Sequence, residues 1–433
     1  MPGPAVRGGP QSGTMEKGER IEMGFGKQKR QEREAVGLYL HIPFCRSKCD
    51  YCDFYSLAGR EDRMDRYQKA LLTHLKETAG MAGDFPVDTV YFGGGTPSYY
   101  GARRLRALLA EVKKRFRVEK DAEITAEANP DSVDLKGLRM LRRAGFNRLS
   151  LGMQSADPGE LAAVHRPHTP EQTAQAVEAA RKAGFDDLSL DLIYGLPGQT
   201  EDSWHATVEA ALALGPEHLS CYGLKGEEGT PLAARAAAGE TLPDDDTQAE
   251  LYLWTVDRLA RAGYEQYEIS NFAKPDHASR HNLRYWLTRP YLGFGPGAHS
   301  DFGGRRYSFV RDLDAYIQGV LTGGDIIDSA DQIPQRERGG EYLMLRLRTA
   351  RGVEEWEYRG TYFMDFGPIE ARLREFAAQG WAERTAEGRW RLTPKGFLVS
   401  NQLIGDLLER QEQASLRDLL PRARERYASG REG

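Results

Sequence analysis

A short pattern recurs three times along the chain, each time just before a run of apolar residues. It reads Arg-Ala-Gly-Phe from position 143, Lys-Ala-Gly-Phe from 182 and Arg-Ala-Gly-Tyr from 261. A basic residue followed by glycine is typical of a helix end, because the cation offsets the negative helix terminus and glycine closes the helix in the left-handed conformation. The spacings, 39 and 79 residues (143 to 182 to 261), match one and two strand–helix units. The pattern therefore predicts a repeated βα architecture.

Short apolar runs alternate with amphipathic stretches from Leu38 onward. One such stretch begins at Thr169-Pro170-Glu171-Gln172, which has the N-cap, first-turn proline and capping-box glutamine of a helix start. Strand–helix alternation predicts parallel strands with right-handed crossovers, in either a barrel or an open doubly wound sheet. The predicted strands are Leu38–Phe44, Val87–Phe92, Glu123–Ala128, Arg148–Met153, Leu188–Tyr194 and His218–Leu224.

The two ends of the chain differ in composition from this α/β region. Residues 1–36 are rich in Gly, Pro and charge without apolar periodicity, which predicts a disordered leader. Beyond about residue 330, a helical stretch is followed by a hairpin around 386–388 and a helix from Pro394. This order predicts a C-terminal α+β, winged-helix-like domain over 331–433. Residues 37–275 then form the α/β domain, and 276–330 form a connecting segment.

The bulk charge and hydropathy restrict the class of protein. The net charge is −5, from 59 basic and 64 acidic residues, which argues against a nucleic-acid or membrane-surface partner. The sequence contains no long uncharged apolar run and no signal-peptide core, so we expect a cytoplasmic protein without a transmembrane segment. Its four cysteines are then expected to be thiols or metal ligands.

Three of those cysteines lie on one short loop after the first predicted strand. Cys45, Cys49 and Cys52 have the spacing to hold three irons of a four-iron cluster, with the fourth iron left open for a small ligand. A structural zinc site would need a fourth ligand, and Cys221 is far along the chain in a predicted strand. A redox pair of Cys49 and Cys52 is a further alternative, but it leaves Cys45 unexplained.

Other polar and glycine residues follow the predicted strands. Gly93-Gly94-Gly95-Thr96-Pro97 comes directly after the second strand, and glycines allow a close backbone approach to a ligand. Glu127, Gln154 and Asp191 fall at strand ends, and Arg166 falls in a following loop. Carboxylates suit hydroxyl and ammonium groups, and arginine suits a carboxylate.

A strand followed by Cys-x3-Cys-x2-Cys, with the aromatic Tyr51 before the third cysteine, resembles the radical S-adenosylmethionine superfamily. The resemblance implies a partial (βα)6 barrel and a 4Fe-4S cluster on Cys45, Cys49 and Cys52. It also implies that S-adenosylmethionine binds the open iron and is cleaved there to a 5′-deoxyadenosyl radical. By the same resemblance, the residues that contact S-adenosylmethionine are Tyr39, Tyr51, Gly94, Gly95, Thr96, Glu127, Gln154, Arg166 and Asp191.

Within the superfamily, the chain resembles two related families. One is the oxygen-independent coproporphyrinogen III dehydrogenase, which has a fourth cysteine two residues after the third; here that position is Phe54. The other is the HemW family of heme chaperones, which the runs at 267–273, 281–286 and 295–300 resemble. Gly223-Leu224-Lys225 departs from the Gln-Leu-Thr typical of that family. We favour heme binding and delivery over decarboxylation, and both over a nucleic-acid-modifying enzyme, which the acidic balance disfavours.

The HemW resemblance implies heme, an acceptor protein for it and a reductant for the cluster as partners. It also points to His281 as the heme ligand, because His281 opens the segment of the family associated with heme. Tyr285 and Trp286 in that segment have faces that suit a porphyrin, and Arg280 and Arg284 suit its propionates. His299, after a Gly-Pro-Gly turn, is the second candidate.

Overall fold

The computed structural model describes residues 33–413, and the predicted leader lies almost entirely outside them. Six parallel strands lie side by side in the order of the sequence. A doubly wound sheet would reverse its strand order at a switch point, whereas sequential order is that of a barrel. The predicted partial (βα)6 barrel is therefore confirmed. Its strands are β1 (Val36–Ile42), β4 (Pro86–Gly94), β5 (Arg117–Ala128), β6 (Arg148–Gln154), β7 (Asp187–Tyr194) and β8 (His218–Gly223).

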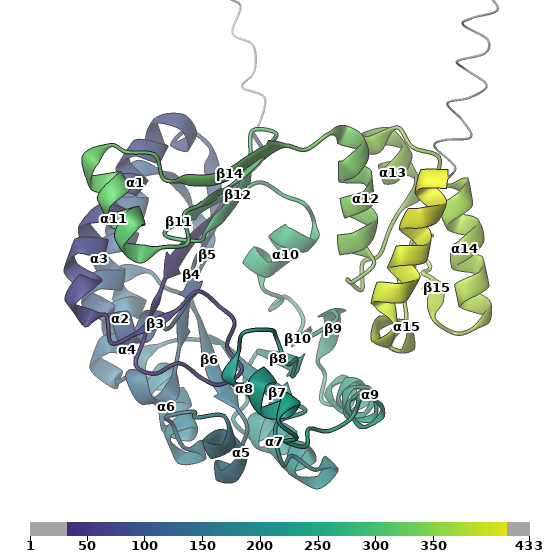
Figure 1. Ribbon diagram of the computed structural model, residues 1–433, viewed down its shortest axis with the longest axis horizontal. Coiled ribbons are helices and arrows are strands. Elements are labelled where there is room, and N and C mark those ends of the chain that lie inside the picture. The colour runs from purple at the N-terminus through teal and green to yellow at the C-terminus, as the bar shows by residue number, and fades with distance from the viewer. Residues whose placement is uncertain (1–32, 414–433) are drawn as a thin grey trace, which may run out of the picture. The chain divides into compact units, whose positions relative to one another are not determined.

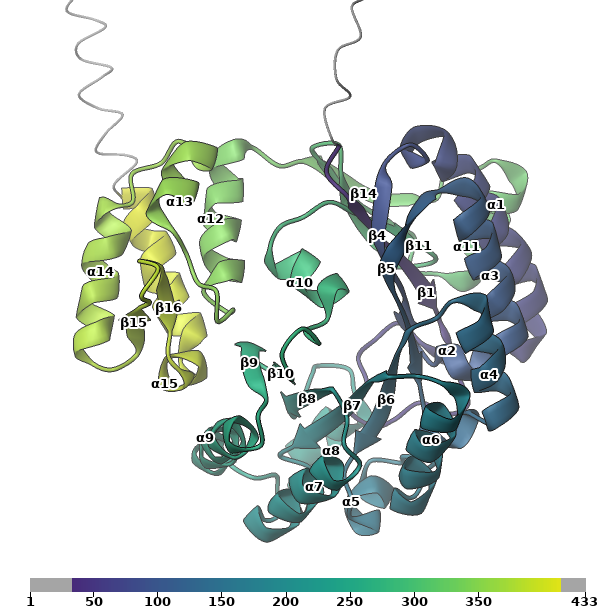
Figure 2. The same cartoon turned by 180° about the vertical axis from the view of Figure 1, so that it is seen from behind.

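Helices between these strands cover the outer face of the sheet (Figures 1 and 2). Gly145 and Gly184 close two of them in the left-handed conformation, and Thr169 with Gln172 forms the predicted capping box. The helices bury Tyr67, Leu109 and other apolar side chains against the strands. They are α1 (Met64–Ala82), α2 (Pro97–Tyr100), α3 (Ala102–Arg115), α4 (Leu135–Ala144), α5 (Pro158–Ala163), α6 (Pro170–Ala183) and α7 (Glu201–Ala213). Two further helices, α8 (Pro231–Ala237) and α9 (Asp245–Arg261), follow β8.

Short strands extend the sheet at both edges. Beside β8 lie β10 (Asn271–Ala273) and β9 (Glu265–Glu268). Beside β1 lies β11 (Tyr291–Phe294), in parallel, followed by three antiparallel strands, so the segment expected as a connection builds much of this edge. These strands are β12 (His299–Phe302), β13 (Arg305–Phe309) and β14 (Ile327–Gln332), with α11 (Leu313–Thr322) after β13 and α10 (Arg280–Trp286) before β11.

The remaining described residues form a C-terminal module with its own apolar core. Tyr342, Ile369, Phe376 and Trp390 are among the side chains buried there. The order of elements is three helices, a hairpin and a helix, as the sequence suggests for a winged-helix-like module. They are α12 (Gln335–Arg346), α13 (Glu355–Tyr362), α14 (Gly367–Ala378), β15 (Ala382–Arg384), β16 (Trp390–Leu392) and α15 (Pro394–Leu398), followed by helical residues 400–413.

Backbone hydrogen bonds join this module to the barrel edge. The Ile269 N–H donates to Arg348 O, and the Ala350 N–H donates to Tyr267 O, both at 3.0 Å. Between these two bonds Glu268 and Thr349 form an antiparallel bridge. The last turn after α12 therefore continues the barrel sheet for a few residues. None of the helices within residues 33–413 combines the length and apolarity needed to cross a membrane.

Candidate functional site

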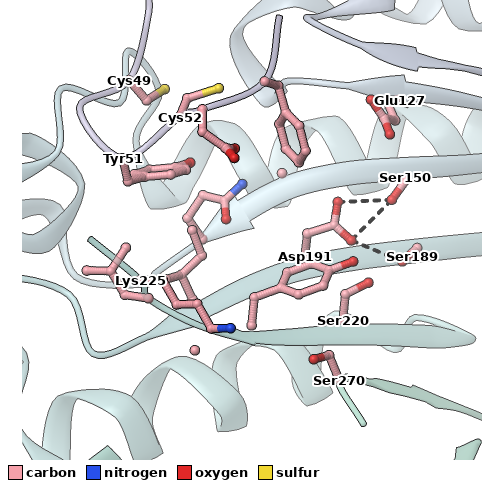
Figure 3. Close-up of a pocket in the computed structure, with 18 of the residues that line it drawn as sticks. Cys49, Tyr51, Cys52, Glu127, Ser150, Ser189, Asp191, Ser220, Lys225 and Ser270 are labelled. Carbon is pink, nitrogen blue, oxygen red and sulfur yellow. Dashed lines mark hydrogen bonds between the residues drawn. The ribbon is translucent and has the colours of Figure 1, made fainter. Parts of the chain in front are cut away.

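A cavity of about 880 Å³ opens at the carboxyl ends of the barrel strands, where ligands bind in such folds. Its wall combines the cysteine loop, the glycine loop after β4, the inner faces of β6, β7 and β8, and residues of α10 and the C-terminal module. The volume is within the range of small-molecule sites in proteins. Figure 3 shows Cys49, Tyr51 and Cys52 at one end of this cavity and Asp191 with its serine partners at another.

The cysteine loop is held by backbone bonds to neighbouring segments. β2 (Phe44–Cys45) pairs with β3 (Leu57–Ala58) on either side of the loop, and the Asp50 N–H donates to Val164 O at 3.3 Å. Its thiols also have polar neighbours. Thr96 Oγ1 donates to Cys45 Sγ and Arg166 Nη1 donates to Cys49 Sγ, each at 3.4 Å. Cys52 Sγ lies 4.0 Å from Ser56 Oγ.

The three thiols suit an iron–sulfur cluster better than a single metal ion. Within residues 33–413 no three ligand side chains surround one ion site. A four-iron cluster takes one thiolate per iron, so its ligands stand apart by the width of the cluster. Burial raises the pKa of Cys45 and Cys52, with repulsion from the other loop thiols adding to the effect. Iron cations would offset this cost of ionisation.

The glycine loop after β4 packs against the first strand too closely for side chains. Gly94 has φ +113°, and a Cβ there would lie 2.4 Å from His41 Cε1. A Cβ on Gly95 would lie 2.8 Å from Ile42 O. The N–H groups of Gly95 and Thr96 donate to Ile42 O and Phe44 O at 2.8 Å. The loop is thereby fixed beside the cysteines, with its backbone exposed to the cavity.

Glu127, at the end of β5, is a half-buried carboxyl group that contacts the glycine loop. Its Oε1 accepts from the Tyr91 hydroxyl at 2.8 Å and its Oε2 from the Gly94 N–H at 3.0 Å. Burial raises the pKa of Glu127 to about 7, and the charge of Asp191 contributes. A carboxylate with this tendency to bind a proton suits a cationic ligand group such as an ammonium.

Arg166 joins the cysteine loop to the end of β6. Its Nη2 donates to Asn129 Oδ1 and to Gly152 O, both at 2.9 Å, while its Nη1 contacts Cys49. Its buried Nε has no hydrogen-bond acceptor within the described residues. Gln154 has φ +63° at a bulge against β7, a conformation that is uncommon for residues with a side chain. Strain at a ligand-facing strand end is typical of a functional site.

The inner faces of β6, β7 and β8 carry mostly polar residues, which alternate with apolar residues along each strand. Asp191 accepts hydrogen bonds from Ser150 at 3.0 and 3.2 Å and from Ser189 at 3.5 Å (Figure 3). Apolar residues alternate with these side chains and face the helices. The strand residues that line the cavity in this way are Arg148, Ser150, Gly152 and Gln154, then Ser189, Asp191 and Ile193, then His218, Ser220 and Tyr222.

Most of the site residues expected from the sequence share this cavity. Its wall includes Cys45, Cys49, Cys52, Tyr51, Gly94, Gly95, Thr96, Glu127, Gln154, Arg166 and Asp191. Tyr39 lies outside the wall, where its hydroxyl bonds His41 Nδ1 at 3.0 Å and its ring stacks on Tyr91. Tyr91, on the neighbouring strand β4, lines the cavity and Tyr39 does not. Sequence reasoning missed Tyr91, Asn129 and the serines, although the alternation of polar residues in the three strands is a visible signal for the serines.

His281, the expected heme ligand, is buried beside the barrel sheet and outside the cavity wall. Its Nδ1 bonds Thr89 Oγ1 at 2.8 Å and its Nε2 bonds the Tyr285 hydroxyl at 2.9 Å. Burial, followed by the charges of Arg284 and Arg148, lowers the pKa of His281 to about 3. Asn282 and Trp286 of the same helix do line the cavity.

The two arginines of α10 are engaged elsewhere. Arg284 is buried, pairs with Asp88 and donates to Ala35 O and Pro290 O. Arg280 donates to Asp121 O at 2.8 Å. Arg284 is therefore committed to other partners in the conformation described, whereas Arg280 is exposed and its side chain bonds one neutral acceptor. His299 is exposed on β12 and is also outside the cavity wall.

The fold and the site define a class of protein. Residues 39–211 match the model of the Radical SAM superfamily, in which a 4Fe-4S cluster and S-adenosylmethionine are the shared cofactors. The cavity places three cysteines, a glycine loop and buried carboxyl groups together, which fits both cofactors. When bound, they supply an electron transfer that cleaves the sulfonium to a 5′-deoxyadenosyl radical. The chain is a radical S-adenosylmethionine protein.

Similar proteins identify the family within this superfamily to which the chain belongs. The heme chaperone HemW of Mycobacterium tuberculosis is 39% identical over 325 residues, which cover 74% of this chain and 83% of that protein. HemW of Bacillus subtilis is 34% identical over 86% of this chain and 98% of its own length. The structure of coproporphyrinogen III oxidase (HemN) from Escherichia coli superposes with a TM-score of 0.77, at 25% identity, over 88% of this chain and 91% of that one. The chain belongs to the HemW family.

Proposed function

We propose that the protein binds heme in the cavity beside the cluster loop and delivers it to an acceptor protein. Several similar proteins are named heme chaperones. The observation that carries the proposal is the extension of the cavity beyond the S-adenosylmethionine residues to Tyr222, Trp286 and Phe397. Aromatic faces of this kind pack well on a porphyrin. We place the delivery in the cytoplasm, where the cluster thiols stay reduced before iron binds.

His281 is the proposed axial ligand of the heme iron, and the structure sets a condition for this role. Both ring nitrogens are hydrogen bonded, so Nε2 has to lose the Tyr285 hydroxyl before it binds iron. The Thr89 bond at Nδ1 fits a ligand role, because a second hydrogen bond fixes the orientation of a metal-bound imidazole. His281 and Tyr285 are one helical turn apart on α10, so rotation of the Tyr285 side chain, with the helix itself unmoved, would separate them and keep the Thr89 bond.

The test is a titration of the cluster-loaded protein with heme, followed by absorption spectroscopy. We expect His281→Ala to weaken heme binding by about tenfold or more and to change the spectrum, because an iron–ligand bond is lost. Tyr285→Phe frees Nε2 and is expected to leave the spectrum unchanged and the affinity equal or higher. His299→Ala is the control for an exposed histidine away from the cavity.

Two results would count against this assignment. An unchanged spectrum in folded His281→Ala protein removes His281 as the ligand and leaves it a role in positioning α10. Absence of heme binding by the wild-type protein rejects the proposed function itself. Bound iron, sulfide and S-adenosylmethionine are measured on each variant, because loss of the cluster would otherwise imitate loss of the heme site.

Decarboxylation of coproporphyrinogen is the competing function. The specific observation in its favour is the similarity to the Escherichia coli oxidase over most of both chains. Against it, Phe54 occupies the position of the fourth cysteine of that enzyme family and is 67% exposed at the cavity. We therefore favour heme delivery and test decarboxylation separately.

A further inference from the structure

The cavity has an outer part in which apolar side chains are exposed. Seven large apolar residues are exposed within the described chain, and three of them line this one cavity: Phe54 (67%), Tyr222 (41%) and Leu398 (40%). They come from the cysteine loop, from β8 and from the C-terminal module. An exposed apolar group of this kind marks a binding site for an apolar ligand surface.

Two cations on the outer wall have no carboxylate partner among residues 33–413. Arg348, from the C-terminal module, is half-buried and donates only to neutral acceptors, Met344 O at 2.7 Å and Asn401 Oδ1 at 2.8 Å. Burial lowers the pKa of Arg348, as expected when nearby negative charge is lacking. Lys225, on the loop after β8, is exposed and forms no ion pair with the described residues.

Arg348 is held in place at both its backbone and its side chain. Its carbonyl accepts from the Ile269 N–H at 3.0 Å, in the segment that joins the module to the barrel. Its guanidinium is fixed by Asn401 on the last described helix. A guanidinium has five N–H donors, so a fixed one with two neutral acceptors retains donors for a bidentate carboxylate.

The inner part of the cavity has the opposite charge distribution. Glu127 and Asp191 face it, and its deep cation Arg148 lies 3.7 Å from the Asp187 carboxylate, with Glu123 adding further negative charge. A ligand carboxylate would meet repulsion there. Of the remaining cations on the wall, Arg166 and Lys48 lie beside the cluster thiols. The outer wall is therefore the part of the cavity suited to a ligand that is both apolar and anionic.

We propose that Arg348 and Lys225 bind the carboxylates of the ligand macrocycle, so that the C-terminal module and the loop after β8 select porphyrins with free propionates. This inference rests on the proposed heme-binding function and specifies how the same cavity recognises its ligand. Lys225 belongs to the Gly-Leu-Lys run that departs from the usual family sequence, so this cation is a feature of this chain. Glu227 is the one acid on the same loop that also lines the cavity.

The experiment compares heme with heme dimethyl ester, in which both propionates are uncharged. We expect the wild-type protein to bind heme about tenfold or more tightly than the ester, because each charge-assisted pair contributes roughly that factor. Arg348→Gln and Lys225→Gln should each weaken heme binding and leave ester binding unchanged. The double variant should bind the two ligands about equally.

Matched controls separate this role from a structural one. Arg359→Gln on α13 and Lys182→Gln on α6 remove exposed cations outside the cavity and should change neither affinity. Arg348→Lys keeps the charge and should retain part of the preference for heme. Cluster content and thermal unfolding are measured for every variant.

The proposal is overturned if the wild-type protein does not distinguish heme from its ester, or if Arg348→Gln weakens both ligands equally. An equal loss would mean that Arg348 shapes the cavity without contacting a carboxylate. If the wild-type protein binds neither ligand, the proposed function fails first. The two failures are thus distinguishable in one titration series.

Discussion

Glu127 is the residue from which we predict that cofactor binding depends on pH. Its pKa is raised from 4.5 to about 7, mainly by burial, so the apo protein holds this group largely protonated below pH 7. A neutral acid cannot pair with the ammonium of S-adenosylmethionine. Conversely, the stability that the neutral group confers on the apo fold is complete below pH 4.5 and is lost as pH rises through about 7.

We therefore predict that S-adenosylmethionine binds more weakly as pH falls from 8 to 5.5, approaching about tenfold per pH unit below the pKa. His41 and His168, whose pKa values are lowered to about 4 by burial, remain neutral throughout this range. Equilibrium binding at several pH values provides the measurement. Glu127→Gln should bind weakly and without this pH dependence, and a flat profile for the wild-type protein would contradict the role of Glu127.

The cysteines allow a second prediction at the same scale. Cys45→Ala, Cys49→Ala and Cys52→Ala should each fail to assemble the 4Fe-4S cluster, because each thiolate holds a different iron. Cys221→Ala should assemble it fully, since Cys221 is buried in the core between β8 and the helices. Iron and sulfide analysis after anaerobic reconstitution tests both statements. A complete cluster in Cys49→Ala, or none in Cys221→Ala, would show that the ligand set is wrong.

Many residues of the site could be predicted individually, because they belong to short motifs at the ends of strands. The alternation in Arg148-Leu-Ser-Leu-Gly-Met-Gln154 also shows which side of β6 faces the ligand. The environment of His281 could not be predicted in this way. Its bond to Thr89 joins α10 to β4 across 192 residues of sequence, while its bond to Tyr285 lies within α10. Sequence alone does not show such a distant pairing.

At the scale of elements, the glycine loop at the end of β4 has little tolerance for an added side chain. Gly94→Ala places a methyl group against the His41 ring and requires an L-residue at φ +113°. We predict a loss of about 1–3 kcal/mol in the free energy of unfolding, together with loss of S-adenosylmethionine binding. Urea denaturation and a binding assay measure the two effects.

Gly101→Ala is the matched control for this prediction. Gly101 has a similar φ of +102°, but a Cβ there meets no atom within 4 Å. It therefore reports the backbone strain without the clash, and it lies outside the cavity wall. If the two variants lost equal stability and both retained cofactor binding, the close contact between Gly94 and His41 would have no measurable importance.

Element prediction succeeded where burial imposes a pattern on the sequence. The six barrel strands are apolar on the face that packs against helices, and Gly145 and Gly184 end their helices as their positions suggest. β14 was missed because all six of its residues are exposed and no apolar alternation marks it. β12 and β13 are short antiparallel strands. They are stabilised by pairing with their neighbours, and their own composition does not predict them.

At the scale of the whole molecule, the site depends on segments that the sequence separates widely. The C-terminal module was predicted as a unit, but its contribution of Arg348, Phe397 and Leu398 to the cavity was not. The bridge between Glu268 and Thr349 joins the module to the barrel edge, and Tyr252 of α9 is buried in the module's apolar core. A contact between segments this far apart in the sequence leaves no periodic signal in either of them.

The prediction for the whole molecule concerns the competing reaction, decarboxylation of a porphyrinogen. We expect no decarboxylation of coproporphyrinogen III by the cluster-loaded protein with S-adenosylmethionine and a reductant under anaerobic conditions. The position two residues after Cys52 is Phe54, and its phenyl ring has no acidic proton or thiolate to contribute to the chemistry.

Chromatography of the porphyrins after oxidation measures this outcome, with coproporphyrinogen III oxidase from Escherichia coli assayed in parallel as the positive control. The same preparation must bind S-adenosylmethionine and heme, so that inactivity is not the result of an empty or misfolded site. Protoporphyrinogen formed by the wild-type protein, at a rate that depends on S-adenosylmethionine, would restore the decarboxylase function. Cleavage of S-adenosylmethionine without porphyrin turnover would not contradict heme delivery. The residues expected to bind the cofactor line the same cavity as the outer aromatic residues, so cofactor cleavage could occur beside either heme or a porphyrinogen.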